Sequence, residues 1–146
     1  MNVGDVIRSE HDEVRRTISK LEASGQDPEG RRQMFLQMVK IVEAHFRAEE
    51  GIVFVELRKV PSLKDLTDEL TAEHNALRLL ATDLANLKAG DSMWRSRLAV
   101  INELAAAHFS KEETIVIPHA PELFSMATLE ALGKRFEELF NREAAK

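Results

Sequence analysis

The hexapeptide His-Phe-Arg-Ala-Glu-Glu at residues 45–50 recurs as His-Phe-Ser-Lys-Glu-Glu at residues 108–113. The displacement is 63 residues (45 to 108), and the dipeptide Glu-His at residues 10–11 recurs at residues 73–74 with the same displacement. A constant period across helix-like sequence indicates that the chain contains two copies of one helix pair. The copied polar residues fall where a core should be apolar, which predicts a metal site inside a four-helix bundle.

The residues around the copied histidines repeat with the spacing of amphipathic helices. The first helix of each copy carries the stripe Ile7, His11, Val14, Ile18 and Leu21, or Leu70, His74, Leu77, Ala81 and Leu84. The second helix carries Phe35, Met38, Val42, His45, Glu49 and Ile52, or Leu98, Ile101, Ala105, His108, Glu112 and Ile115. In the second stripe a His and a Glu stand one turn apart, so both project from the core face.

Glycine, proline and capping residues predict where the helices begin and end. Helices are expected over about residues 3–24, 31–59, 62–88, 92–117 and 127–143. Ser62 with Asp65 resembles a capping box that opens the third helix. The residues expected to end helices are Gly25, Pro61, Pro118 and Pro121. The prediction is an all-α protein: an up-down-up-down four-helix bundle over about residues 3–117 and a short fifth helix over about 127–143 that takes no part in the chemistry.

Composition is that of a soluble globular protein. At 146 residues, with 44% hydrophobic and 31% charged residues, the chain suits a single domain over residues 1–146. Neither a membrane-spanning run nor a secretory signal is present, so a cytoplasmic location and no membrane partner are expected. With no cysteine, a metal must be held by nitrogen and oxygen. A net charge of −5 without a basic stripe argues against nucleic acid as a partner, and the oligomeric state stays open.

Helix lengths indicate that the polar side chains can meet. About 13 residues separate His11 from the end of its helix, and about 14 separate the start of the next helix from His45, so both lie at nearly the same height. The same count brings the second copy to this level within about one turn. The residues expected to converge are His11, His45, Glu49, His74, His108 and Glu112. A bound cation would offset the cost of burying them.

This set of residues resembles the hemerythrin-like family, also called the HHE cation-binding family, over about residues 5–121. The resemblance implies a bundle that holds two Fe ions bridged by two carboxylates and by an oxo or hydroxo group. By position, His11 and His45 would ligate one iron, His74 and His108 the other, and Glu49 and Glu112 would bridge. The ferritin-like alternative uses Glu-x-x-His pairs, whereas here the His comes first at a spacing of four.

The choice of iron rests on the resemblance. Two imidazoles and two carboxylate oxygens per ion suit Fe, Mn, Zn or Co, so Zn or Mn are expected substitutes. Oxygen-carrying hemerythrins resemble this chain except for one more histidine, at the position of Arg78. Without it both irons should be five-coordinate, with room for a small ligand. The chain has no tyrosine, which excludes a tyrosyl radical or a phenolate ligand.

The predicted function is a non-haem di-iron protein that binds or senses O₂ or a related small molecule such as NO or peroxide. Two alternatives stay open. One is a di-iron enzyme that decomposes peroxide or reduces an oxidant, and the other is a protein of iron storage or homeostasis. Turnover of peroxide, compared with binding of O₂ or NO without turnover, would separate the first two, and whether the chain is an enzyme at all is left open.

Five further polar residues are not expected as ligands. Glu50 and Glu113 turn about 100° from the bridging positions and should face a neighbouring helix or solvent. Glu10 and Glu73 either orient an imidazole N–H or form ordinary surface pairs. His119 lies past a proline and about 16 Å further along the helix axis than His108, so it is not expected to bind iron.

Overall fold

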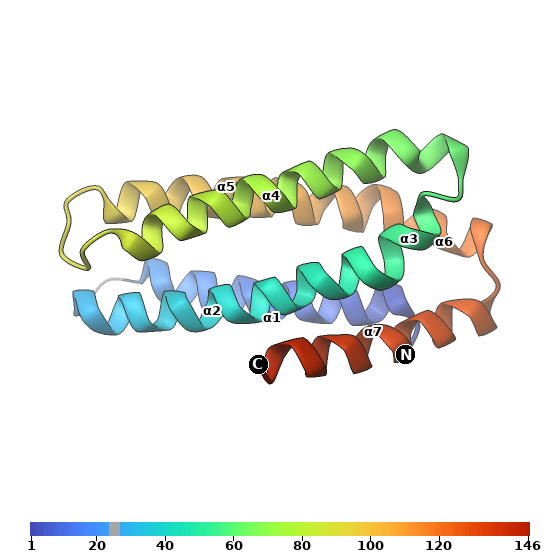
Figure 1. The fold of residues 1–146 in the computed structure, drawn as a ribbon, viewed down its shortest axis with the longest axis horizontal. Helices are drawn as coiled ribbons and strands as arrows, with labels where there is room; N and C mark the ends of the chain where they lie inside the picture. Colours follow the sequence, from blue (N-terminus) through green and yellow to red (C-terminus); the bar gives the residue numbers. More distant parts are fainter. Residues whose placement is uncertain (24–26) are drawn as a thin grey trace.

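Four long helical segments run antiparallel, and a fifth helix packs along one side of them (Figure 1). The computed structural model describes residues 1–23 and 27–146. The elements are α1 (Val3–Glu22), α2 (Pro28–Ala48), the π-helical turn η1 (Glu49–Val53), α3 (Phe54–Leu57), the 3₁₀ turn η2 (Pro61–Leu63), α4 (Lys64–Asn86), α5 (Trp94–Lys111), the π-helical turn η3 (Glu112–Val116), α6 (Ile117–Leu123) and α7 (Met126–Ala144). The predicted all-α bundle with an additional C-terminal helix is confirmed, and the described residues contain no strand.

Side-chain caps start three of the helices. Asn2 accepts a hydrogen bond from the backbone of Asp5 at the start of α1, and Asp27 and Ser125 cap α2 and α7 in the same way. The capping box predicted at Ser62 is wrong. That residue lies inside η2, and α4 begins after Leu63 without a side-chain cap, because the 3₁₀ turn already leads the backbone into the helix.

The fourth helical segment ends later than predicted, and one predicted helix end cannot be compared. Gly25, expected to end the first helix, lies outside the described residues. The fourth segment does not end near residue 117, because it continues through both prolines as α6 to Leu123. Pro118 stands in the first turn after η3, where a missing N–H is tolerated, and Pro121 is followed by only two more helical residues.

The two π-helical turns begin at the two predicted bridging residues, Glu49 and Glu112. A π turn bonds residue i to residue i+5 and so contains more residues than an α turn. The additional residue rotates the side chains that follow around the helix axis. Ile115, expected in the core, is 47% exposed, while Val116 is buried in its place. The prediction is therefore wrong for Ile115, whereas Ile52, at the same position of η1, is 8% exposed and lies in a turn that packs against α7.

The polar residues form a layer between two apolar clusters. One cluster lies at the α7 end of the bundle and includes Ile7, Leu70 and Phe136. The other lies toward the α1–α2 and α4–α5 connections and includes Val14, Leu77 and Trp94. Each cluster buries apolar surface on its own side of the polar layer. No helix in the described part of the chain has the length and apolar character needed to cross a membrane.

Helix α7 packs against α1 and α2 through a close approach of backbone to backbone (Figure 1). Gly133 is buried in this contact, and a Cβ atom there would lie 2.4 Å from the carbonyl oxygen of Met1. Because the obstructing atoms belong to the backbone around Met1–Val3, they cannot move aside as a flexible side chain would. Only glycine fits at this position.

Gly133→Ala should therefore destabilise the protein by about 1–3 kcal/mol, in the range of overpacked cores, despite the better helix propensity of alanine. Gly90→Ala is the matched control, since no atom lies within 4 Å of a Cβ built there. Chemical denaturation of both variants measures the effect. Equal stability of the two variants would contradict the close packing of α7.

Candidate metal centre

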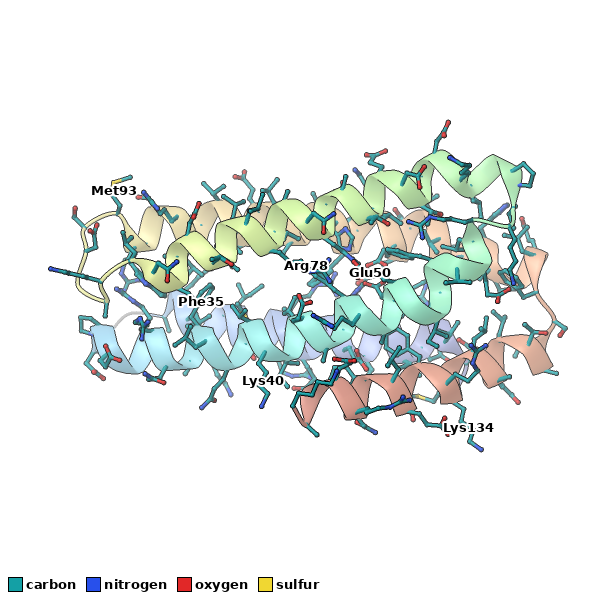
Figure 2. All side chains as sticks on the ribbon, in the orientation of Figure 1. Phe35, Lys40, Glu50, Arg78, Met93 and Lys134 are labelled. Atoms are coloured by element: carbon teal, nitrogen blue, oxygen red, sulfur yellow. The ribbon has the colours of Figure 1, made fainter. Side chains whose placement is uncertain are left out.

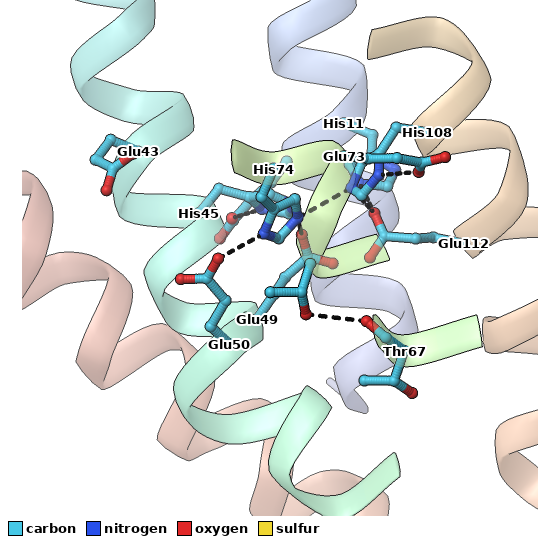
Figure 3. Close-up of polar contacts among 12 residues, drawn as sticks. His11, Glu43, His45, Glu49, Glu50, Thr67, Glu73, His74, His108 and Glu112 are labelled. Atoms are coloured by element: carbon cyan, nitrogen blue, oxygen red, sulfur yellow. Dashed lines mark hydrogen bonds and ion pairs between the residues drawn. The ribbon is translucent and has the colours of Figure 1, made fainter. Parts of the chain in front are cut away.

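The structure brings together all six residues predicted to converge (Figure 3). None is more than 2% exposed, so the cluster is closed to bulk water. Their potential ligand atoms form two groups, in each of which the atoms lie within 4.8 Å of one another. The first group is His11, His45, Glu49 and Glu112, and the second is Glu49, His74 and His108.

Each carboxylate reaches across both histidine pairs. Oε1 of Glu49 lies 3.0 Å from Nε2 of His45 and 3.3 Å from Nε2 of His74. Oε1 of Glu112 lies 3.3 Å from Nε2 of His11 and 3.2 Å from Nε2 of His108. Each glutamate therefore contacts one histidine of each group, which is the placement that a bridge between two ions requires.

A carboxylate holds the outer nitrogen of every one of the four imidazoles. The Nδ1 atom donates to a glutamate on a neighbouring helix at 2.6–2.9 Å in the pairs His11–Glu113, His45–Glu10, His74–Glu50 and His108–Glu73. Donation from Nδ1 fixes the tautomer, so that each Nε2 carries a lone pair directed into the centre. This is the arrangement by which proteins orient imidazole ligands and raise their basicity.

Several of the atoms that face the centre have no hydrogen-bond partner. Nε2 of His74 and Nε2 of His108 lie 3.0 Å apart, so in the neutral tautomers with Nδ1 as the donor their two lone pairs face each other. Among the described residues, the buried Nε2 atoms of His11 and His45 and both oxygens of Glu49 have no hydrogen-bond partner. Lone pairs and carboxylates gathered in this way repel one another unless a cation lies between them. The donor set fits divalent metal ions.

The pKa values of the site reflect the same excess of negative potential. Burial lowers the pKa of His45, but the charge of Glu49 and the hydrogen bonds with Glu10 and Glu49 raise it to about 10. For His108, hydrogen bonding and the charge of Glu112 outweigh burial and raise the pKa to about 9. In the absence of metal, protons on these imidazoles supply part of the positive charge that the cluster requires.

Two arginines extend the network outward at equivalent positions of the repeat. Arg78 contacts both oxygens of Glu50, at 2.8 and 3.0 Å, and its Nε donates to Glu43 at 2.8 Å. Burial raises the pKa of Glu50, but hydrogen bonds from His74 and Arg78 lower it to about 2. Arg15, 63 residues earlier, donates to Glu113 at 2.8 Å. Each arginine thus holds a carboxylate against an imidazole.

Sequence reasoning found only part of this outer network. Glu50 and Glu113 do face a neighbouring helix, as expected, but they bind histidines there, which the sequence did not indicate. Glu10 and Glu73 orient imidazoles, one of the two roles considered. The sequence did contain a signal for this outer network. Arg15 recurs as Arg78, and the doubled glutamates recur as well, with the 63-residue displacement of the central histidines.

Aromatic rings enclose the centre. Phe46 stacks on His74 with ring centroids 3.8 Å apart, and Phe109 stacks on His11 at 4.0 Å. Phe136 of α7 meets the ring of His45 at 5.7 Å. The fifth helix therefore contacts a residue of the centre as well as packing against the bundle.

His119 is not brought to the centre. It lies in α6, is 42% exposed and pairs with Glu122 at 2.9 Å. The expectation that it stands apart from the other four histidines agrees with this position.

The fold and the buried cluster define a helical bundle built around a cation-binding centre. Residues 2–120 match the hemerythrin HHE cation binding domain, and the chain belongs to that family. A curated relative from Nostoc sp. (strain PCC 7120 / SAG 25.82 / UTEX 2576), named "DNA nickase", is 27% identical over 114 residues, which are 78% of this chain and 32% of the relative. The chain thus spans about a third of that relative's length. No solved structure matches the chain.

Metal binding should stabilise the folded chain, because the unfolded chain has no preformed site. We expect saturating Fe²⁺ or Zn²⁺ to raise the melting temperature by about 5–10 °C and a chelator to reverse the change. Calorimetry of the metal-free and loaded protein measures the shift, and a His74→Ala/His108→Ala variant is the control. A melting temperature that does not respond to metal would contradict a cation site in the polar layer.

Proposed function

We propose that this chain is a non-haem di-iron protein that binds or senses O₂ or a related small molecule such as NO or peroxide. The observation that carries the proposal is the reach of Glu49 and Glu112, each of which contacts one histidine of both pairs. In the proposed assignment His11 and His45 hold one ion and His74 and His108 the other. Iron, when bound, supplies exchangeable coordination positions and a change of oxidation state.

Arg78 supports the proposal that each ion keeps a free position. It occupies the place of the additional histidine of oxygen carriers, and its guanidinium is turned toward Glu50 and Glu43. Its contacts with these carboxylates raise its pKa further, so it stays a cation and cannot serve as a ligand. Both ions are then left with two imidazoles and two shared carboxylates.

The residues of the chain have three tasks in this function. Glu10, Glu50, Glu73 and Glu113 hold the imidazoles in their ligating tautomer. Phe46 and Phe109 cover two of the imidazoles and help to exclude water from the centre. Burial of the six central side chains keeps large substrates away from the centre.

The activity named for the Nostoc relative is not part of the proposal. The match covers 32% of that protein, so its activity can lie outside the shared segment. In this chain the six central side chains are at most 2% exposed, and the backbone of a DNA duplex cannot reach them. The net charge of −5 also disfavours contact with phosphates.

We expect two iron ions per chain by metal analysis. Replacing any of His11, His45, His74 or His108 with Ala should weaken metal binding at least about tenfold, and replacing Glu49 or Glu112 should weaken it more, because each contacts both pairs. His119→Ala is the control and should load normally, since its ring lies apart from the centre. One ion per chain, or normal loading of Glu112→Ala, would contradict the assignment.

The ferrous protein should not carry oxygen reversibly. Mixed with air-saturated buffer in a stopped-flow spectrometer, it should end in the ferric state and should not return to the ferrous spectrum under argon. Azide and NO should still bind, because Arg78 is paired with Glu50 and does not act as a ligand. A spectrum that returns under argon would favour transport, and multiple turnover of peroxide would favour the enzyme alternative.

A further inference from the structure

A cavity of about 260 Å³, partly open to solvent, lies between the four long helical segments on the side of the polar layer away from α7. Its walls come from α1, α2, α4 and α5 and are mainly apolar, with Val14, Met38 and Leu77 among them. Phe46 and Phe109 close it toward the metal centre, and Phe35 lines its far end. In Figure 2, Phe35 and Arg78 mark two levels of this region between α2 and α4.

The cavity follows from a difference between the two copies of the repeat. Ile18 in the first copy corresponds to Ala81 in the second, and Val42 corresponds to Ala105. All four residues line the cavity, so the second copy leaves empty the volume that larger side chains would fill. An apolar hollow between helices leaves surface in contact with water that a ligand of matching shape would bury, so the space suits an apolar ligand.

The shape and charge of the cavity restrict that ligand. Phe35 and Phe46 are eleven residues apart on α2, which corresponds to about 16 Å along the axis. The charged residues at the rim, Glu43 and Arg78, are paired with each other at 2.8 Å. The remaining polar side chains at the opening between α2 and α4 include Thr82 and Asn86, which are neutral hydrogen-bonding groups.

We propose that this cavity is a second binding site, which takes an uncharged molecule with an unbranched alkyl chain of about eight to ten carbons, because the rings of Phe35 and Phe46 occupy part of the distance between them. The apolar chain lies along the bundle axis and its polar end reaches Thr82 or Asn86 at the opening. The site does not require metal. A bound alkyl chain contacts Phe46 and Phe109, the two residues whose rings stack on His74 and His11.

A series of 1-alkanols from butanol to dodecanol tests the proposal on the metal-free full chain. Trp94 is the single tryptophan, and its ring meets that of Phe35 at 5.7 Å, so its fluorescence reports on the far end of the cavity. Affinity should increase about fourfold with each methylene until the chain fills the cavity, and then level off. An affinity that does not depend on chain length would overturn the proposal.

The repeat supplies the substitutions that fill the cavity. Ala81→Ile with Ala105→Val restores the residues of the first copy and should weaken octanol binding at least tenfold while the helical content is retained. Ala106→Val, on the exposed face of α5, is the matched control and should bind octanol normally. Undiminished binding by the folded double variant would overturn the proposal; if that variant does not fold, the chain-length series decides alone.

Discussion

Four hydrogen bonds between imidazole Nδ1 groups and carboxylates fix the polar layer on which the rest of the structure depends. They connect α1 to η3, α5 to α4, α4 to η1 and α2 to α1, and so form a closed ring around the four long segments. Each bond joins two helices and at the same time directs an Nε2 lone pair inward. Because all four hydrogen bonds direct a lone pair into the same buried space, they assemble a site that requires a cation.

Much of this layer could be predicted from the sequence, because a repeat of 63 residues places equivalent side chains at one height. The partner of each glutamate could not be predicted as directly. Glu10 and His11 are adjacent in the chain, yet successive residues point about 100° apart, so Glu10 binds His45 on α2 while His11 binds Glu113. The π-helical turns were missed because their bonding leaves no mark in a pattern of three- and four-residue steps. Ile115 was misplaced because the two copies are covered differently: Ile52, at the equivalent position, is buried in η1, which packs against α7.

The two halves of the centre have equivalent donors but different surroundings. His74 lies against both Phe46 and Phe54, with ring centroids 3.8 and 5.2 Å away, whereas the position equivalent to Phe54 is Ile117. Lys111 contacts Glu73 behind His108, and the first copy has Ala48 at that position. Positive charge beside a carboxylate weakens its pull on the imidazole proton, so the ligands of the two halves differ in basicity although their types are the same.

Phe46 and Phe109 belong to two sites at once, since each stacks on an imidazole of the centre and also lines the apolar cavity. A rigid ring transmits a displacement from one site to the other without any change in the helices. If occupation of the cavity shifts these rings and so alters the affinity for metal, then metal must alter the affinity of the cavity by the same factor, because the coupling between two equilibrium binding sites is reciprocal. In that case the alanines of the second copy, which line the cavity, would bear on the metal centre through these two rings.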